Sequence, residues 1–222
     1  QVIGDFVWSA WDYIGEACMG DWTYHSYKGL PLLAGQGMID ITGKPLASMY
    51  FMQVVWGLRK EPAIGVDPVT HAKDFRGASM WRDTDAVESW SWDGCEGSRT
   101  GVVVYADADT VQLLVNGRSV GRKKVKECKA LFSKVTYEPG EIEAIALDAA
   151  GRETGRARLI SATGATKLKL SPERTLLRAN GQDLCFLDID LVGENGVTRS
   201  SVDQKLTVEV TGAGTLQAFG SA

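Results

Sequence analysis

The sequence lacks the features that mark membrane and nucleic-acid-binding proteins. No run approaches the ~18 consecutive apolar residues that a membrane-spanning helix needs, so we expect no membrane partner. The formal net charge is −4, whereas a general nucleic-acid binder shows a basic face, so we expect no nucleic-acid partner. The first residues carry no basic segment of the kind that opens a signal peptide. The composition, with 44% hydrophobic and 23% charged residues, is that of an ordinary globular protein.

Cysteine and histidine are too sparse and too scattered for metal or redox chemistry. The only histidines are His25 and His71, and no Cys-x-x-Cys pair occurs among the four cysteines, Cys18, Cys95, Cys128 and Cys185. We therefore predict no metal site and no cofactor. Free thiols are typical of a reducing compartment, so we expect a cytoplasmic location, with a secreted or periplasmic location as the open alternative.

The sequence opens on a stretch around which the rest can be organised. Residues 4–8 form a short apolar and aromatic run without polar alternation, which predicts a strand buried on both faces, as in a parallel sheet. The stretch then turns polar at Trp11, Asp12, Tyr13 and Glu16, beyond the expected end of the strand. In α/β barrels that end of a strand carries the chemistry. The alternative is a core strand whose tryptophans only fill space.

A single helix should follow this strand after a long irregular loop over residues 15–36. Pro45 is predicted to open the helix, apolar residues recur at helical spacing from Leu46 to Trp56, and Gly57 ends it. Strand, loop and helix make one β/α unit. One such unit cannot bury its own apolar strand, so we expect the other strands to lie outside this sequence and the chain to be an excised fragment.

A polar connection is predicted over residues 57–76, and a domain boundary falls within it. Short strands with turn residues between them follow, predicted at 87–92, 101–106, 111–115, 131–137, 142–148 and 154–162. The dipeptide Asn116-Gly117 predicts a two-residue hairpin, because both positions favour positive φ. Short strands without a convincing helix indicate a β-sandwich of immunoglobulin-like size.

A second β series begins near Lys167. Alternation over residues 184–192 predicts a strand that turns Cys185, Leu187, Ile189 and Leu191 toward a core, and another strand is predicted at 206–210. We therefore divide the chain into residues 1–58, a terminal β/α unit, residues 59–163, an immunoglobulin-like β-sandwich, and residues 164–222, a second and truncated sandwich.

These motifs resemble family 2 glycoside hydrolases, the family of β-galactosidases and β-glucuronidases. Residues 4–16 resemble the last strand of that family's catalytic barrel, and residues 37–57 resemble its eighth β/α unit. Residues 90–94 and 115–121 resemble the immunoglobulin-like domain that follows the barrel. The resemblance implies a mainly β fold, with two immunoglobulin-like β-sandwich domains preceded by the last β/α unit of a (β/α)8 barrel.

The resemblance also implies which residues contact substrate. The position that matches Trp8 is an aromatic wall of the sugar site in that family, and Asp12 and Glu16 are candidates for hydrogen bonds to sugar hydroxyls. The alternative for both carboxylates is a loop role, in which backbone N–H groups or an arginine satisfy them. The two catalytic glutamates of the family lie on the fourth and seventh barrel strands, which this sequence does not contain. We therefore predict no catalytic residue here and no activity of this chain alone.

The function implied is that of a retaining glycosidase acting on terminal β-galactosides, with a carbohydrate as partner and a homo-oligomer left open. The competing hypothesis is a non-catalytic carbohydrate-binding or structural module that would use Trp90 and Trp92 as an aromatic platform. We favour a core position for both tryptophans, because paired tryptophans on one strand face usually pack inside. The basic residues 122–124 are predicted to be a solvated hairpin end, with an anion site as the alternative.

Overall fold

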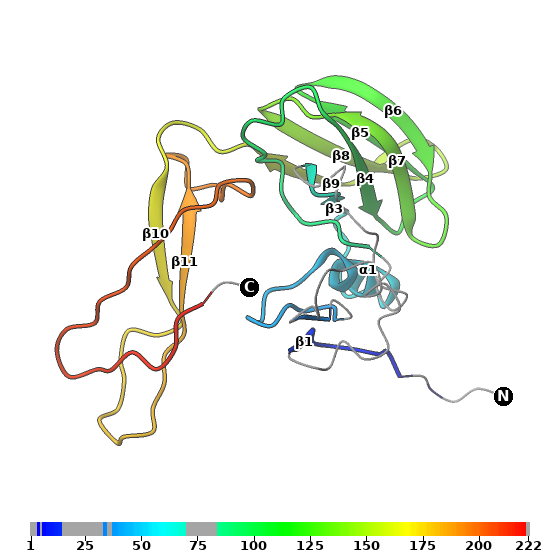
Figure 1. Cartoon of the computed structure of the whole chain (residues 1–222). Helices are drawn as coiled ribbons and strands as arrows, with labels where there is room; N and C mark the ends of the chain where they lie inside the picture. The colour runs from blue at the N-terminus through cyan, green and yellow to red at the C-terminus, as the bar shows by residue number, and fades with distance from the viewer. Residues whose placement is uncertain (1–3, 5, 15–32, 35–36, 70–83, 221–222) are drawn as a thin grey trace.

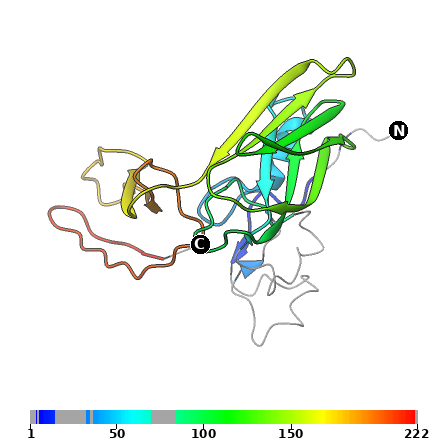
Figure 2. The same cartoon turned by 90° about the horizontal axis from the view of Figure 1, so that it is seen from above.

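The structure, a computed structural model, describes residues 4, 6–14, 33–34, 37–69 and 84–220 (Figure 1). The described residues are mainly β, as predicted, and they include one α-helix. Figure 2 shows that the last pair of strands stands to one side of the sandwich. Within the described ranges no helix has the length and apolar character needed to cross a bilayer.

The N-terminal part is small and centred on the helix α1 (Ala47–Val55). Leu46 is its N-cap residue, so the helix begins two residues after Pro45, which was predicted to open it, and Gly57 follows the helix with a φ of 67°. Strands β1 (Tyr13–Ile14) and β2 (Leu33–Ala34) pair antiparallel at the two ends of the predicted loop. The residues between them lie outside the described ranges, and so do His25 and Cys18.

Seven strands build the β-sandwich in two antiparallel layers (Figure 1). One layer has the order β3-β4-β7, and its strands are β3 (Ala63–Val66), β4 (Arg99–Tyr105) and β7 (Lys129–Thr136). The other has the order β6-β5-β8-β9, with β5 (Thr110–Val115), β6 (Arg118–Lys124), β8 (Glu141–Leu147) and β9 (Glu153–Ile160). The predicted strands from residue 101 to 162 are confirmed within a few residues.

The predicted hairpin at Asn116-Gly117 is confirmed by its geometry. The two residues have φ values of 49° and 73°, as a two-residue turn between twisted strands requires. The Asn116 side chain also ties this turn to the neighbouring Pro139-Gly140 turn, since it donates to the Pro139 carbonyl at 3.1 Å and accepts from the Glu141 N–H at 2.8 Å. The two turns at this end of the sandwich are therefore held together.

The polar connection predicted over residues 57–76 is wrong in its first half. All four residues of β3 are buried, and β3 pairs with β4 at the edge of the first layer. The short apolar run Ala63–Val66 was hidden in the sequence by the prolines on either side of it, Pro62 and Pro68. A run of four residues is too short for periodicity to reveal.

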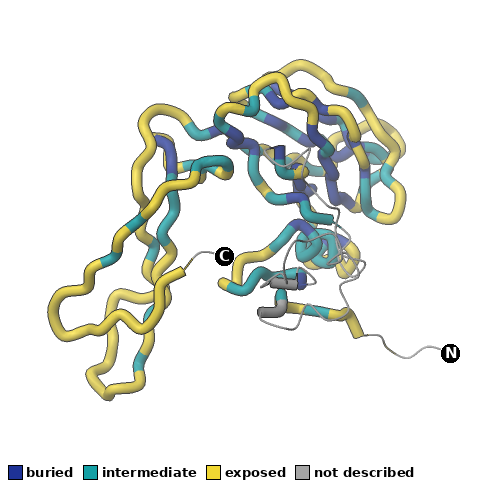
Figure 3. The backbone as a smooth tube through the Cα atoms, viewed as in Figure 1, coloured by how far each residue is buried: buried dark blue, intermediate teal, exposed yellow. Residues whose placement is uncertain are grey.

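The core lies between the two layers and accounts for most of the burial in the molecule (Figure 3). One layer supplies Ile64, Val102, Val104 and Phe132, and the facing layer supplies Val111, Leu113, Ile142 and Ala144, all less than 5% exposed. Aliphatic side chains at alternate positions of paired strands therefore form one continuous apolar layer.

Helix α1 is docked on the outer face of the β3-β4-β7 layer. Ala47 and Val54 of the helix share a second, smaller apolar cluster with Ala63, Val103 and Tyr105. A Cβ added at Gly65 would come within 3.0 Å of Ala86 and 3.2 Å of Ala47, so the close approach of the helix needs glycine there. Small side chains on both sides therefore fix the helix against the sandwich.

Trp90 and Trp92 belong to the core, as favoured, although the segment that carries them is not a strand. They are 0% and 3% exposed. The Trp90 indole donates to the Glu138 carbonyl at 3.0 Å and meets the Tyr137 ring edge-on at 5.0 Å. The predicted strand over residues 87–92 is wrong, because these residues form no strand, and Ser91 between the two tryptophans is buried as well.

Residues 164–220 contain one antiparallel pair, β10 (Lys167–Pro172) and β11 (Leu187–Val192). Leu168 pairs with Leu191 and Leu170 with Ile189, so one face of the pair is apolar. The predicted strand at 206–210 is not formed, and Leu187 is 46% exposed rather than buried. Two strands alone cannot enclose a core, which explains why these apolar residues remain accessible.

A polar junction joins this pair to the sandwich. The Arg199 guanidinium donates to the Asp93 carboxylate and to the Gly164 carbonyl, and its side chain is only 10% exposed. Asn195 accepts from the Thr163 N–H at 3.1 Å and donates to the Ser161 carbonyl at 2.9 Å. The β10–β11 part is therefore attached to the sandwich by side-chain hydrogen bonds and an ion pair as well as by the chain itself.

Candidate functional site

The opening stretch does not form the strand predicted for it. Phe6, Val7 and Trp8 lie outside any strand and are 99%, 51% and 68% exposed. A strand buried on both faces needs apolar neighbours on each side, and the described residues supply none there. The described part of this stretch makes one parallel pairing, an isolated bridge between Trp11 and Ile39.

Asp12 is held by the backbone of the segment that precedes the helix. Its Oδ1 accepts from the Gly37 N–H at 2.7 Å, and its own N–H donates to the Ile39 carbonyl at 2.9 Å. A Cβ added at Gly37 would lie 2.3 Å from the Asp12 nitrogen, which no side chain tolerates. Glycine at 37 therefore permits the close contact, and one Asp12 oxygen has the backbone role that was the alternative to sugar binding.

A tight turn over residues 40–44 follows the segment that contacts Asp12. Asp40 Oδ1 accepts from the Thr42 N–H at 2.8 Å, the Thr42 hydroxyl at 2.7 Å and the Lys44 N–H at 3.0 Å. Partial burial acts to raise the pKa of Asp40, but these hydrogen bonds outweigh it and lower the pKa below its ordinary value. The Trp11 indole lies beside this turn, 3.4 Å from where a Cβ of Gly43 would stand.

Two of the three predicted site residues lie within the described part of the chain. Trp8 and Asp12 lie in one exposed segment, with the peptide between Trp8 and Ser9 in the cis form. Glu16 lies outside the described residues. Asp40 and Gly37 were not predicted as site residues, and the signal for them was the run Gly37–Asp40 within the residues that resemble the family's eighth β/α unit. The described residues hold no group of three or more His, Cys, Asp or Glu side chains suited to a metal ion.

The β10–β11 pair reaches the same turn. Lys44 lies 3.5 Å from an Asp190 oxygen and 3.8 Å from an Asp188 oxygen, and all three side chains are at least a quarter exposed. Exposed ion pairs contribute little to stability, typically below about 1 kcal/mol. The contact shows which face of β11 is turned toward the helix-bearing part: the polar face, with the apolar face pointing away.

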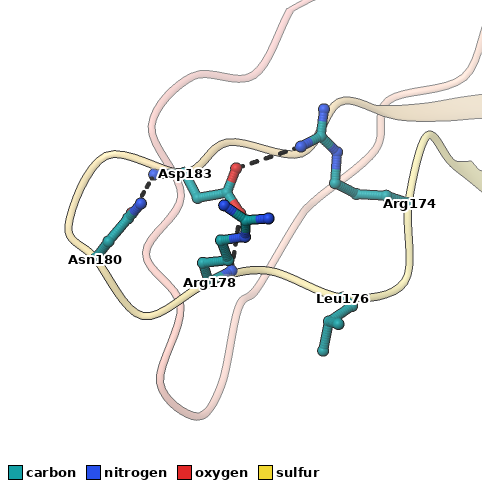
Figure 4. A pocket seen from close by; sticks show the side chains of 5 residues that line it. All are labelled: Arg174, Leu176, Arg178, Asn180 and Asp183. Carbon is teal, nitrogen blue, oxygen red and sulfur yellow. Dashed lines mark hydrogen bonds and ion pairs between the residues drawn. The ribbon is translucent and has the colours of Figure 1, made fainter.

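A hollow lies in the loop between β10 and β11 (Figure 4). It measures about 500 Å³ and is lined by Arg174, Leu176, Arg178, Asn180 and Asp183. Asp183 occupies its middle, accepting from the Arg178 N–H at 2.8 Å and pairing with the Arg174 guanidinium at 3.3 Å. Asn180 closes the loop by accepting from the Asp183 N–H at 2.9 Å. The hollow is thus the inside of a self-bonded loop rather than a built ligand site.

Two family models match the chain. Residues 97–155 match the domain of unknown function DUF4982, and residues 168–222 match the glycoside hydrolase family 2 C-terminal domain 5. The first match lies within the sandwich, and the second begins one residue after the start of β10.

Individual relatives point to the same family. The chain is 27% identical to a β-galactosidase of Bacteroides ovatus over 96% of its own length, and 30% identical to a putative β-glucuronidase of Formosa agariphila over 76%. It spans only 22% and 14% of those two proteins.

A solved structure shares the fold. A glycosyl hydrolase family 2 member from Bacteroides cellulosilyticus matches with a TM-score of 0.70 and 30% identity, over 89% of this chain and 26% of that one. The order of the elements, the two matched domains and these relatives agree, and the chain belongs to family 2 of the glycoside hydrolases, as part of their C-terminal region.

Proposed function

We propose that this chain is the C-terminal part of a retaining glycosidase that hydrolyses terminal β-galactosides. The observation that carries the proposal is the match to the β-galactosidase of Bacteroides ovatus, which extends over 96% of the chain and so includes most of the opening segment. The putative β-glucuronidase relative, matched over 76%, is the reason that the sugar needs a direct test.

Within this proposal the chain contributes binding rather than proton transfer. Glycoside hydrolysis with retention needs an acid and a nucleophile, two carboxyl groups about 5 Å apart. We assign neither to this chain. The 68% exposed indole of Trp8 is proposed to supply an apolar face for the C–H side of a sugar ring, and Asp12 is proposed as a hydrogen-bond acceptor for a sugar hydroxyl. Glu16 is proposed as a second acceptor.

The domain division at residues 58 and 163, and a cytoplasmic location, are part of the same proposal. The model matches at 97–155 and 168–222 support a boundary between the two β domains. Free thiols at Cys95, Cys128 and Cys185 support a reducing compartment. Limited proteolysis with mass spectrometry tests the boundaries, and fractionation of cells of the source organism tests the compartment.

The experiment that tests the function is a chimera. The region of the Bacteroides ovatus β-galactosidase that aligns with this chain is replaced by residues 1–222, and turnover of 4-nitrophenyl β-galactoside and β-glucuronide is compared. We expect galactoside turnover with retention, seen as the β-anomer by NMR, and none by residues 1–222 alone. A folded chimera that prefers the glucuronide contradicts the assignment of the sugar, and turnover by the chain alone contradicts the assignment of the roles.

No observation favours a non-catalytic module with an aromatic carbohydrate-binding platform as a second candidate. Its platform would require exposed indoles, and Trp90 and Trp92 are buried.

A further inference from the structure

The positive charge of this acidic chain is concentrated in one segment. Residues 118–134 hold seven basic residues and one acidic residue, a net charge of +6. The whole chain carries −4, so the remaining residues carry −10. The segment comprises β6, the turn after it and most of β7, and β6 is an edge strand of its sheet.

Five cations of this segment are exposed and have no carboxylate partner within ion-pair distance among the described residues: Arg122, Lys123, Lys124, Lys126 and Lys134. We call them the β6 basic strip. Arg122 donates only to the Gln112 amide oxygen, at 3.1 Å. The two other cations of the segment are engaged, since Arg118 pairs with Glu138 and the Lys129 ammonium lies 4.2 Å from the Phe51 ring centre.

The basic side chains on the opposite edge of the same sheet are paired with carboxylates, unlike those of the β6 basic strip. On β9, Arg156 pairs with Glu143 at 2.7 Å and with Glu153 at 2.8 Å, and Arg158 pairs with Glu141 at 3.1 Å. Both edges carry basic side chains, which protect an edge strand from pairing with another chain. Edge protection alone does not explain why one edge is neutralised by carboxylates while the other is left with net charge.

The strip has the shape of a row. Arg122, Lys123 and Lys124 are consecutive on β6, and Lys126 follows just after the strand, so their backbone positions span about 13 Å at roughly 3.3 Å per residue. Because side chains alternate along a strand, Arg122 and Lys124 stand on one side of this edge and Lys123 on the other. Asp109, whose carbonyl accepts from Val125 at 3.0 Å, and Glu127 border the turn end. The charge is therefore greatest along β6 itself. A row of point charges fits a linear polymer with repeated anionic groups better than a single small anion.

The lack of exposed aromatic rings in the segment favours a polysaccharide over a single-stranded nucleic acid as the anionic polymer. The only aromatic residue in the segment is Phe132, which is 4% exposed, so the segment offers no exposed aromatic ring on which nucleic-acid bases could stack. We propose that the β6 basic strip binds a linear anionic polysaccharide that carries carboxylate or sulfate groups on its sugar units. The choice of a carbohydrate rests on the proposed function, in which the same protein acts on sugars.

The test measures binding by the whole chain, residues 1–222, without any activity. Polygalacturonate is the anionic probe and dextran the neutral one, in affinity electrophoresis and isothermal titration calorimetry at low and at high salt. We expect binding to polygalacturonate that weakens as salt rises, because ionic contacts are screened, and no binding to dextran. The Lys123→Glu/Lys124→Glu variant should bind about 10- to 30-fold more weakly, taking roughly 1 kcal/mol for each cation.

The matched control is Lys60→Glu/Lys205→Glu, which changes the net charge equally at two exposed lysines away from the strip. Equal loss in both variants, or no binding to polygalacturonate, overturns the proposal. Equal binding to poly(dT), or to vesicles of phosphatidylserine and phosphatidylcholine, overturns the assignment to a polysaccharide. If the charge reversal prevents folding, Lys123→Gln/Lys124→Gln replaces it, with a smaller expected loss. Binding that fails beside an active chimera refutes only the strip, whereas an inactive chimera with binding retained refutes only the proposed function.

Discussion

Trp90→Phe separates the core role of this tryptophan from a sugar-binding role. The substitution removes the indole N–H that donates to the Glu138 carbonyl at 3.0 Å, which costs about 1 to 1.5 kcal/mol for a buried hydrogen bond. It also leaves a void where the second ring packed, at a site that is 0% exposed, for about 1 to 2 kcal/mol more. We therefore expect a loss of roughly 2 to 3.5 kcal/mol in the free energy of unfolding.

The assay is urea denaturation followed by far-UV circular dichroism, with Trp56→Phe as the matched control. Trp56 is 69% exposed, so the same change there should cost no more than about 0.5 kcal/mol. Polysaccharide binding should be unchanged in both variants. Equal stabilities for the two variants, or weaker sugar binding by Trp90→Phe, would refute the core role of Trp90.

Three further predictions concern named contacts. Ser161→Ala removes the hydroxyl that donates to the Trp90 carbonyl at 2.5 Å and accepts from the Gly140 N–H at 3.0 Å. It should cost about 1 to 3 kcal/mol by urea denaturation, whereas exposed Ser133→Ala should cost almost nothing. Burial, then a hydrogen bond and the charge of Glu88, raise the pKa of Tyr50 to about 12 from an ordinary value of 10. The stability linked to this shift is complete below pH 10 and is lost as pH rises toward 12, so thermal melts of Tyr50→Phe should fall less steeply over that interval. Gly37→Ala places a Cβ 2.3 Å from the Asp12 nitrogen, so hydrogen exchange at the Ile39 amide should accelerate; unchanged exchange would contradict this packing.

The sandwich was predictable because its signals are local. The alternation Val111, Leu113, Val115 and the turn Asn116-Gly117 specify strand, face and hairpin without knowledge of the partner strand. The helix was predictable for the same reason, from 3.6-residue periodicity and Gly57. Strand β3 was missed because four residues between two prolines carry no readable period.

The predictions that depended on distant partners were less successful. The run at Phe6, Val7 and Trp8 reads as a buried strand, yet burial requires neighbours that the described residues do not provide. The Ser91 hydroxyl accepts from the Ala162 N–H at 3.0 Å, a contact across 71 positions that no local pattern contains. The Asp12–Gly37 bond spans 25 residues and was hidden for the same reason.

The most direct test of the central claim is the effect of Trp8→Ala in the β-galactosidase chimera. If Trp8 forms a wall of the sugar site, losing the apolar area it covers should lower kcat/KM for 4-nitrophenyl β-galactoside about 10- to 100-fold, while the exposed Trp56→Ala control keeps its activity. A Trp8→Ala chimera with the kcat/KM of its parent would contradict the claim that this segment contacts the substrate.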